Sequence, residues 1–369
     1  MTETEQEKTV RPFSGGEKDT LVKEVVVLNG ERCVTLDCLL QSCSDEFDFI
    51  DRRPALLILP GGGYWFCSAR EAEPVAYPFL AAGYQVFILR YSVREFRTWP
   101  NPLRDYEQAA RLIRSRADEW HLFPDKLAVL GFSGGAHLAA CAATMSESER
   151  PAAAVIGYGP TLGKTIEPYL RSFVAPAEHV DENTCPCFLF TSRTDPLIPV
   201  ENTLQFTEAL TKAGVSFESH VYAYGPHGFS IANTALRDPN VPYCSRIAHW
   251  VNDAVDWLKD MLGDFSGAGF TAPRCPRRVD GNRDPYLSAY CTVNYLLTQG
   301  VRDAVGTVLG KAREKFNFYA DLDFYRKDEG VFEAMFFDLP LETVANQFSV
   351  PKADVKEADE ILRQIPNRR

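Results

Sequence analysis

The segment that decides the fold is Leu127-Ala-Val-Leu-Gly131-Phe-Ser133-Gly-Gly135-Ala-His-Leu-Ala-Ala-Cys-Ala-Ala-Thr-Met145. It begins with a short apolar run, passes through glycines that flank a serine, and continues in small apolar residues. The apolar run, which ends at glycine, predicts a buried strand, and the following run of small residues predicts a closely packed helix. A strand that turns sharply into a helix is a building unit of a parallel sheet covered by helices.

The sequence on both sides of this segment repeats the same alternation. Upstream, two strand-like runs meet at Asn29-Gly30, a dipeptide that favours a tight hairpin turn. Short apolar strands separated by helical periodicity indicate a mostly parallel sheet with both faces covered. We therefore predict an α/β fold with a doubly wound sheet. The predicted strands are 24–27, 33–40, 55–59, 85–89, 127–130, 153–157, 187–191 and 217–222, and the predicted helices are 103–120, 136–145, 200–213 and 245–262.

The chain has 369 residues, which allows one large domain and a smaller one. We expect a flexible lead over 1–20 and the sheet-containing catalytic domain over 21–262. A stretch rich in Gly, Pro, Arg and Asp predicts a linker over 263–284. Residues 285–369 show helical patterns without a convincing strand, and we expect a small helical domain there. Its predicted helices are 286–298, 301–316, 330–337, 341–348 and 352–365.

The sequence shows no signal for export, membrane insertion or a bound metal. Met1–Lys8 is polar and lacks the apolar core of a secretory signal, and the most apolar windows are too short to span a bilayer. Of the ten cysteines only Cys185 and Cys187 are close in sequence, and no second pair has metal-binding spacing. We expect a cytoplasmic protein with reduced thiols and no zinc site.

Ser133 has the surroundings of a catalytic nucleophile. Gly131-Phe-Ser-Gly-Gly135 fits G-x-S-x-G between a predicted strand and a predicted helix, where the glycines permit a strained turn that lifts the hydroxyl above the sheet. A serine hydroxyl attacks an ester only when a base takes its proton and N–H groups hold the oxyanion that forms. The alternative interpretation is a glycine turn that only packs a helix against a strand.

A second glycine-rich loop follows an earlier predicted strand, at Pro60-Gly-Gly-Gly-Tyr64. Glycine lets the backbone approach a substrate closely, and loops at this position direct N–H groups at the oxyanion. We expect the N–H groups of Gly62 or Gly63, together with that of Gly134, to form the oxyanion hole. The absence of Gly-Lys-Ser/Thr argues against a phosphate-binding loop.

The remaining parts also come at strand ends. Asp195 follows the strand at 187–191, whereas Asp181, the alternative acid, precedes it. His227 follows the last predicted strand in Gly225-Pro-His-Gly228 and is the one histidine placed to act as a base. We predict that Asp195 orients His227 and that His227 takes the proton of Ser133. The chain order Ser, Asp, His is that of the α/β-hydrolases.

With these motifs in place, residues from about 50 to 262 resemble the acetyl esterase and xylan esterase branch of the α/β-hydrolases. The resemblance implies a triad of Ser133, Asp195 and His227, no metal and no organic cofactor. Bacterial enzymes near this branch remove acetyl or feruloyl groups from plant polysaccharides. Pro60 departs from the histidine found there in many relatives. The matching segments are 60–64, 68–74, 89–93, 131–135, 195–199 and 225–228.

The aromatic residues after the glycine loop bear on the substrate. We assign Tyr64 and Trp65 to substrate binding, because aromatic rings stack on sugars; core packing is the alternative for Trp65 and Phe66. The short insertion between 159 and 184 favours small acyl groups on a bulky alcohol. We expect Arg70 to pair with one of the neighbouring acids, Glu71 or Glu73.

The predicted function is a serine carboxylesterase that removes short acyl groups, acetyl above all, from sugars or xylo-oligosaccharides through an acyl-enzyme on Ser133. A peptidase or amidase of the same fold and a non-catalytic binding or regulatory protein are the alternatives.

The C-terminal domain leaves a further question open. Leu341–Val355 follows helix-turn-helix spacing, with Ala345 at the close crossing and Ser349 at the turn. A DNA-reading helix should be basic, but Lys352–Arg363 carries four acids against three bases, and the whole chain has a formal net charge of −11. We expect no nucleic-acid partner. The domain is expected to pack on the catalytic domain, cover its active site or form a homo-oligomer contact.

Overall fold

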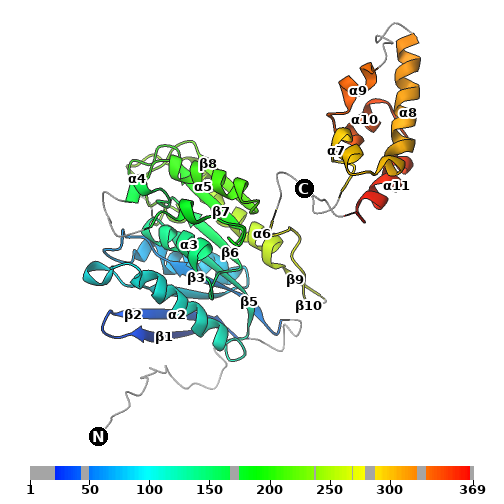
Figure 1. Cartoon of the computed structure of the whole chain (residues 1–369). Coiled ribbons are helices and arrows are strands. Elements are labelled where there is room, and N and C mark those ends of the chain that lie inside the picture. Colours follow the sequence, from blue (N-terminus) through cyan, green and yellow to red (C-terminus); the bar gives the residue numbers. More distant parts are fainter. Residues whose placement is uncertain are drawn as a thin grey trace. The chain divides into compact units, whose positions relative to one another are not determined.

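The computed structural model describes residues 21–42, 50–166, 174–236, 238–267, 269–278, 287–321 and 330–365. The chain divides into two compact units, Met1–Arg278 and Val279–Arg369, which are labelled by element in Figure 1. The first unit holds the sheet, and all regular elements described in the second are helices. The lead expected over 1–20 lies outside the described residues.

One eight-stranded sheet forms the centre of the first unit, in the order β1-β2-β4-β3-β5-β6-β7-β8. Only the pairs β1–β2 and β2–β4 are antiparallel, so the predicted mostly parallel α/β sheet is confirmed. After β3 the next strand, β4, is added on the side of β1, whereas β6, β7 and β8 follow β5 toward the opposite edge. Ligands bind beyond the carboxyl ends of the strands where the strand order reverses in this way. The strands are β1 (Leu21–Asn29), β2 (Val34–Gln41), β3 (Arg53–Leu59), β4 (Gln85–Arg90), β5 (Leu122–Phe132), β6 (Ala153–Gly157), β7 (Cys187–Ser192) and β8 (Phe217–Tyr222).

The predicted hairpin forms at the edge of the sheet, but its turn differs from the expected one. β1 and β2 pair from Leu21 opposite Gln41 to Asn29 opposite Val34. The left-handed residue of this connection is Cys33, with φ 55°, rather than Asn29 or Gly30. A two-residue turn of the expected kind needs positive φ at both central residues, so a longer connection replaces it.

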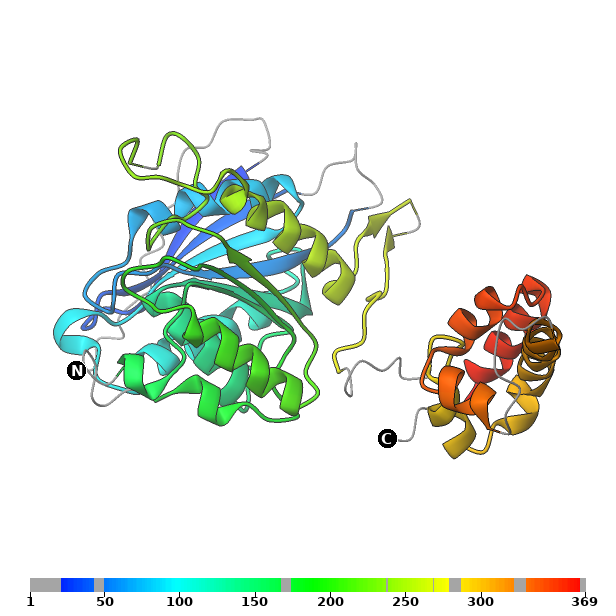
Figure 2. The same ribbon diagram turned by 90° about the horizontal axis from the view of Figure 1, so that it is seen from above.

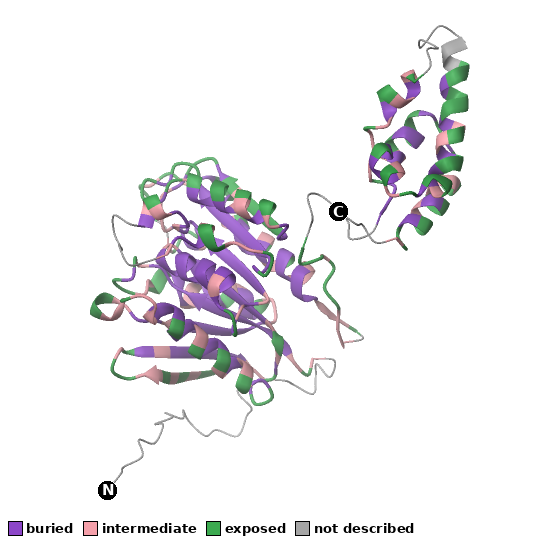
Figure 3. Ribbon diagram, in the orientation of Figure 1, coloured by how far each residue is buried: buried purple, intermediate pink, exposed green. Residues whose placement is uncertain are grey.

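Helices cover both faces of the sheet, as Figure 2 shows. Helices α2, α3 and α5 pack on one face, and α1 and α6 pack on the other. A hydrophobic core lies on each face of the sheet. Leu57 of β3 belongs to the core under α2, α3 and α5, and its neighbour Leu56 belongs to the core under α1 and α6; both are fully buried. Burial on both sides explains why the central strands, largely purple in Figure 3, are mostly apolar. These helices are α1 (Glu73–Ala81), α2 (Asn101–Ser115), α3 (Gly134–Met145), α5 (Glu201–Lys212) and α6 (Trp250–Leu262), and the short α4 is Gly163–Ile166.

The residues that follow α6 belong to the first unit as far as Arg278. β9 (Phe265–Ser266) and β10 (Gly269–Phe270) form a small hairpin, and Arg278 makes an isolated bridge to Val215. The linker predicted over 263–284 therefore begins with residues whose contacts lie with the sheet. Gly and Pro content indicated an irregular chain there and said nothing about what that chain touches.

The second unit has a hydrophobic core of its own. The predicted helix-turn-helix spacing is realised in α10, a turn and α11: Ser349 has φ 49° at the turn, and Ala345 is fully buried. The five helices described in this unit are α7 (Val293–Thr298), α8 (Arg302–Asp321), α9 (Val331–Phe336), α10 (Leu341–Gln347) and α11 (Lys352–Leu362).

Within the described residues no helix is both long enough and apolar enough to cross a membrane. The same residues contain no group of three or more His, Cys, Asp or Glu side chains placed to hold a metal ion. The nine cysteines described are free thiols.

Replacing Gly135 with Ala is expected to destabilise the first unit by about 3 kcal/mol or more. An added Cβ would lie 2.0 Å from the backbone oxygen of Leu59, and a backbone atom cannot turn aside as the end of a flexible side chain can. Urea or thermal unfolding measures the change. Gly30→Ala is the control, because nothing lies within 4 Å of its added Cβ. Equal unfolding midpoints for Gly135→Ala and the unsubstituted protein would contradict the close contact.

Candidate active site

Four loops meet at the carboxyl edge of the sheet. The glycine loop follows β3, Ser133 follows β5, Asp195 comes after β7, and His227 comes after β8. Because the strands are parallel and adjacent in the order β3-β5-β6-β7-β8, their carboxyl ends share one edge. This edge brings together side chains that are far apart in the sequence.

Ser133 occupies a strained turn between β5 and α3. Its backbone has φ 50° and ψ −117°, a conformation that costs a non-glycine residue about 1–3 kcal/mol. The surroundings hold it there: its N–H donates to Gly157 O at 3.0 Å. A Cβ on Gly131 would lie 2.1 Å from Gly135 O, so the glycines of the motif are required by the close crossing of strand and helix. The strained turn presents the hydroxyl at the sheet edge.

The three residues predicted as a triad are joined by short hydrogen bonds. His227 Nδ1 lies 2.7 Å from Asp195 Oδ2, and His227 Nε2 lies 2.8 Å from Ser133 Oγ. The carboxylate only accepts, so Nδ1–H donates to it and Nε2 is left to accept the serine proton. The second oxygen of Asp195 accepts the N–H groups of Leu197 and Ile198 at 2.8 and 2.9 Å, and these bonds keep its buried carboxylate in place. The arrangement is that of a nucleophile, a base and an orienting acid.

Asp181, the alternative acid in the sequence, lies elsewhere. Its carboxylate forms an ion pair with Arg150 at 3.3 Å and accepts a hydrogen bond from the Thr184 hydroxyl at 3.1 Å. It precedes β7, so it does not reach the carboxyl edge. Asp195 is the carboxylate that the structure places against His227.

The glycine loop and the start of α3 lie against each other beside Ser133. A Cβ on Gly134 would be 3.1 Å from the backbone nitrogen of Gly63, and Gly62 and Gly63 both have positive φ, 126° and 57°. In the described parts of the chain no backbone carbonyl accepts the N–H of Gly62, Gly63 or Gly134. These N–H groups are therefore available to an oxyanion on Ser133, and their role stays a prediction.

Tyr64, which we assigned to substrate, lies in the protein interior with 1% of its surface exposed. Its hydroxyl donates to His137 Nδ1 at 2.8 Å, and His137 Nε2–H donates to Val174 O at 2.8 Å. Left-handed backbone at Tyr64, φ 62°, turns this side chain inward. The assignment of Tyr64 to substrate contact is thus corrected to a structural role.

Trp65 and Phe66 lie on the surface, 58% and 56% exposed, so the alternative of core packing is wrong for both. The guanidinium carbon of Arg97 lies 3.9 Å from the centre of the Trp65 ring, a cation–π contact on one face. A Cβ on Gly63 would lie 4.0 Å from Trp65 Cδ1, which places this indole next to the glycine loop.

The ion pair expected between Arg70 and Glu71 or Glu73 does not form. Arg70 Nη2 donates to Gly228 O at 2.9 Å, and Glu71 accepts the N–H of Gly61 at 2.9 Å. Glu73 pairs instead with Arg90 at 3.0 Å. The side chains of Arg70, Glu71 and Glu73 thus each contact a different segment of the chain. Glu71 and Arg70 thus contact loops of the site, which sequence spacing alone did not indicate.

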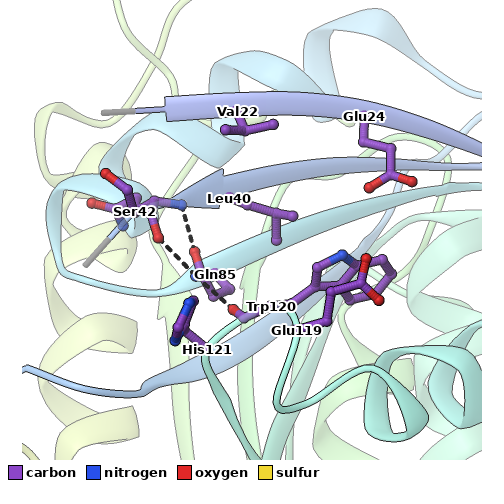
Figure 4. Close-up of a pocket in the computed structure, with 9 residues that line it drawn as sticks. Val22, Glu24, Leu40, Ser42, Gln85, Glu119, Trp120 and His121 are labelled. Carbon is purple, nitrogen blue, oxygen red and sulfur yellow. Dashed lines mark hydrogen bonds between the residues drawn. The ribbon is translucent and has the colours of Figure 1, made fainter. Parts of the chain in front are cut away.

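A surface hollow of about 370 Å³ lies at the other end of the sheet and takes no part in this site (Figure 4). Its lining includes Gln85, the first residue of β4, and His121, which precedes β5. The amide of Gln85 is already bonded to the backbone of Gln41 and of Trp120. Of the short insertion predicted between 159 and 184, residues 167–173 lie outside the described residues.

Comparison with known proteins agrees with this geometry. Residues 51–159 match the family model described as BD-FAE, and residues 163–264 match the prolyl oligopeptidase family. MGS-M1, an alpha/beta hydrolase enzyme from a Medee basin deep-sea metagenome library, is 38% identical with a TM-score of 0.61, and the match covers 66% of this chain and 98% of that one. The chain belongs to the α/β-hydrolase family.

Two curated relatives carry names that describe their activity. The chain is 28% identical to endo-1,4-beta-xylanase B of Butyrivibrio fibrisolvens over 211 residues, 49% of this chain and 33% of the relative. It is 29% identical to an acetylxylan esterase of Xylanibacter ruminicola over 197 residues, 47% of this chain and 41% of the relative. The chain thus spans less than half the length of each of these two relatives.

His137 is expected to make the stability of the first unit depend on pH. Burial lowers its pKa from 6.5 to about 4, so the folded protein resists a proton that the unfolded chain accepts. Its contribution is fully present above pH 6.5 and is lost as the pH falls toward 4, by roughly 3 kcal/mol in total. Denaturant unfolding at pH 7 and pH 4.5 measures this loss.

His137→Gln, which does not titrate, is expected to lose less stability over the same interval. His249→Gln is the matched control, because His249 is exposed. Equal losses for His137→Gln and the unsubstituted protein would show that His137 is not held neutral by burial.

Proposed function

We propose that this protein is a serine-dependent carboxylic ester hydrolase. The observation that carries the proposal is the relay of two short hydrogen bonds, Ser133 to His227 and His227 to Asp195, at the carboxyl edge of an α/β-hydrolase sheet. The Xylanibacter ruminicola relative is named acetylxylan esterase, which supports the same reaction class.

The geometry supports a two-step reaction through an acyl-enzyme. Ser133 Oγ attacks the ester carbonyl carbon as its proton passes to His227 Nε2, and Asp195 stabilises the imidazolium that forms. The N–H groups of Gly62 or Gly63 and of Gly134 would hold the oxyanion. His227 then gives the proton to the leaving alcohol, and the acyl group stays on Ser133. Water, deprotonated by His227, releases the acid by the same route in reverse.

Ser133→Ala is expected to lower kcat/KM for p-nitrophenyl acetate by about 10⁴-fold or more, and His227→Ala by a similar factor, because a triad acts as a unit. Hydrolysis of the ester and covalent labelling by a fluorophosphonate are the two measurements. Ser115→Ala, at an exposed serine of α2, is the control and should retain both. Full activity or labelling in Ser133→Ala would rule out the proposed nucleophile.

The match of residues 163–264 to the prolyl oligopeptidase family favours a second candidate, a peptidase or amidase that uses the same triad. That segment contains both Asp195 and His227. A panel of short acyl esters and peptide anilides separates the two reactions. Larger kcat/KM values for the anilides would favour the peptidase.

We propose short acyl groups, acetyl above all, on sugars or xylo-oligosaccharides as the substrates. The names of the relatives support a xylan-derived substrate. Trp65 supports a sugar: its indole is exposed beside the glycine loop, and Arg97 occupies one face, which leaves the other available for stacking.

Trp65→Ala is expected to raise KM for an acetylated xylo-oligosaccharide roughly five- to ten-fold, which corresponds to about 1 kcal/mol of lost stacking. The value of kcat/KM for p-nitrophenyl acetate, which has no sugar, should change little. Tyr77→Ala, an exposed aromatic residue of α1, is the matched control. An unchanged KM for the oligosaccharide would remove Trp65 from the substrate site.

For the second unit we propose a contact between copies of the chain. The described part of its surface includes four large apolar side chains on different segments, Tyr290, Phe318, Met335 and Ile361. This homo-oligomer contact stays a prediction, as does a cytoplasmic location.

A further inference from the structure

The carboxyl group of Glu71 lies buried between the loops that form the active site. Glu71 ends the short 3₁₀ helix η2 (Ala69–Glu71), which follows the glycine loop, and only 3% of its surface is exposed. Its Oε2 accepts the N–H of Gly61 at 2.9 Å, and its Oε1 accepts the Tyr158 hydroxyl at 2.6 Å. Both oxygens thus accept hydrogen bonds, as in an ionised carboxylate.

Gly61 connects this carboxylate to the nucleophile and to the oxyanion loop. A Cβ on Gly61 would lie 2.5 Å from Glu71 Oε2 and 3.1 Å from Ser133 Cβ. Gly61 also comes directly before Gly62 and Gly63, whose N–H groups we assign to the oxyanion hole. The position of Gly61 against Ser133 therefore depends on where the carboxylate of Glu71 is held.

Tyr158 connects the same carboxylate to the catalytic base. Its ring meets the His227 ring edge to face, with centres 5.2 Å apart and an angle of 73°. Its hydroxyl also accepts the N–H of Ser230 at 3.1 Å, so the hydroxyl proton is the one given to Glu71. The Tyr158 side chain is fully buried. A chain of hydrogen bonds thus runs from Gly61 through Glu71 and Tyr158 to the loop that carries His227.

Arg70, the residue before Glu71, holds the histidine loop from the same side. Its guanidinium donates to Gly228 O at 2.9 Å, and its carbonyl accepts the Ser230 hydroxyl at 2.5 Å. Residues 70 and 71 therefore contact the backbone of the glycine loop and of the histidine loop at once.

The charged and titratable groups around His227 include Asp195, which bonds to its Nδ1, and Glu71, Arg70 and Tyr158. Burial raises the pKa of Glu71, while the bonds from Tyr158 and Gly61 and the positive charges of His227 and Arg70 oppose the rise. Tyr91 is a further titratable neighbour of Glu71, and its hydroxyl donates to Pro60 O at 2.6 Å. Glu71 is thus a second buried acid close enough to the imidazole to interact with its charge, besides Asp195.

We propose that Glu71 is a positioning residue for the reaction. Its carboxylate holds the glycine loop (60–64, the oxyanion loop) in place relative to the loop that carries His227 (225–228, the histidine loop), and its charge favours the imidazolium of His227. Asp195 bonds directly to that imidazole, whereas Glu71 acts through Gly61 and Tyr158. The inference rests on the proposed acyl transfer at Ser133.

The test is the rate of fluorophosphonate labelling of Ser133 as a function of pH, in the full chain, with Glu71→Gln and Glu71→Asp. Glu71→Gln should label about ten-fold more slowly or worse, because small displacements of reacting groups are costly. The acid limb of its pH profile should move to lower pH by about one unit, because loss of a nearby negative charge makes His227 harder to protonate. Glu71→Asp keeps the charge and should be slow with an unshifted acid limb.

Glu73→Gln is the matched control, because Glu73 pairs with Arg90 away from the two loops, and it should keep both rate and profile. Glu71→Gln that labels like the unsubstituted protein, or that loses thermal stability with an unshifted acid limb, would overturn the proposal. If Glu71→Gln does not fold, Tyr158→Phe replaces it, and an unchanged labelling rate there would overturn the proposal too. Absence of labelling in the unsubstituted protein would instead refute the proposed function.

Discussion

The first turn of α3 touches the backbone of β3 directly, and the arrangement of the active site follows from that contact. A side chain at Gly135 would overlap Leu59 O, and one at Gly131 would overlap Gly135 O. Two missing side chains allow the helix to start immediately beyond the sheet edge. The same contact places Gly134 against Gly63, so the nucleophile and the oxyanion loop are neighbours because two backbones pack without side chains between them.

Two buried carboxylates lie at this edge of the sheet, and each accepts more than one hydrogen bond. Asp195 accepts two backbone N–H groups and the imidazole N–H, and Glu71 accepts one N–H and one hydroxyl. A buried carboxylate is costly unless donors surround it, so the loops that supply these donors are held in place by the same bonds. Asp195 and Glu71 therefore have a structural consequence as well as an electrostatic one.

The hydrophobic side chains that stabilise the fold lie in three cores, and Trp65 lies outside all of them. Two cores on opposite faces of the sheet hold the strands, and a third core lies within the helical unit. The exposed indole of Trp65 belongs to none of them. A substitution of Trp65 is therefore expected to leave the sheet undisturbed, whereas the side chain of Tyr64, one residue earlier, is bonded to His137 inside the first unit.

The sequence by itself determined the parallel sheet, and it named the residues of the relay. Each of Ser133, Asp195 and His227 follows a strand that the sequence predicts, and parallel strands place their carboxyl ends along one edge, so local patterns were sufficient. Only the tertiary structure decided that Tyr64 turns inward and Trp65 outward, because the left-handed backbone at Tyr64 is not visible in composition. It alone joined Glu71 to Tyr158, 87 residues apart, since hydrogen bonds between distant loops depend on the folded path of the chain and not on sequence spacing.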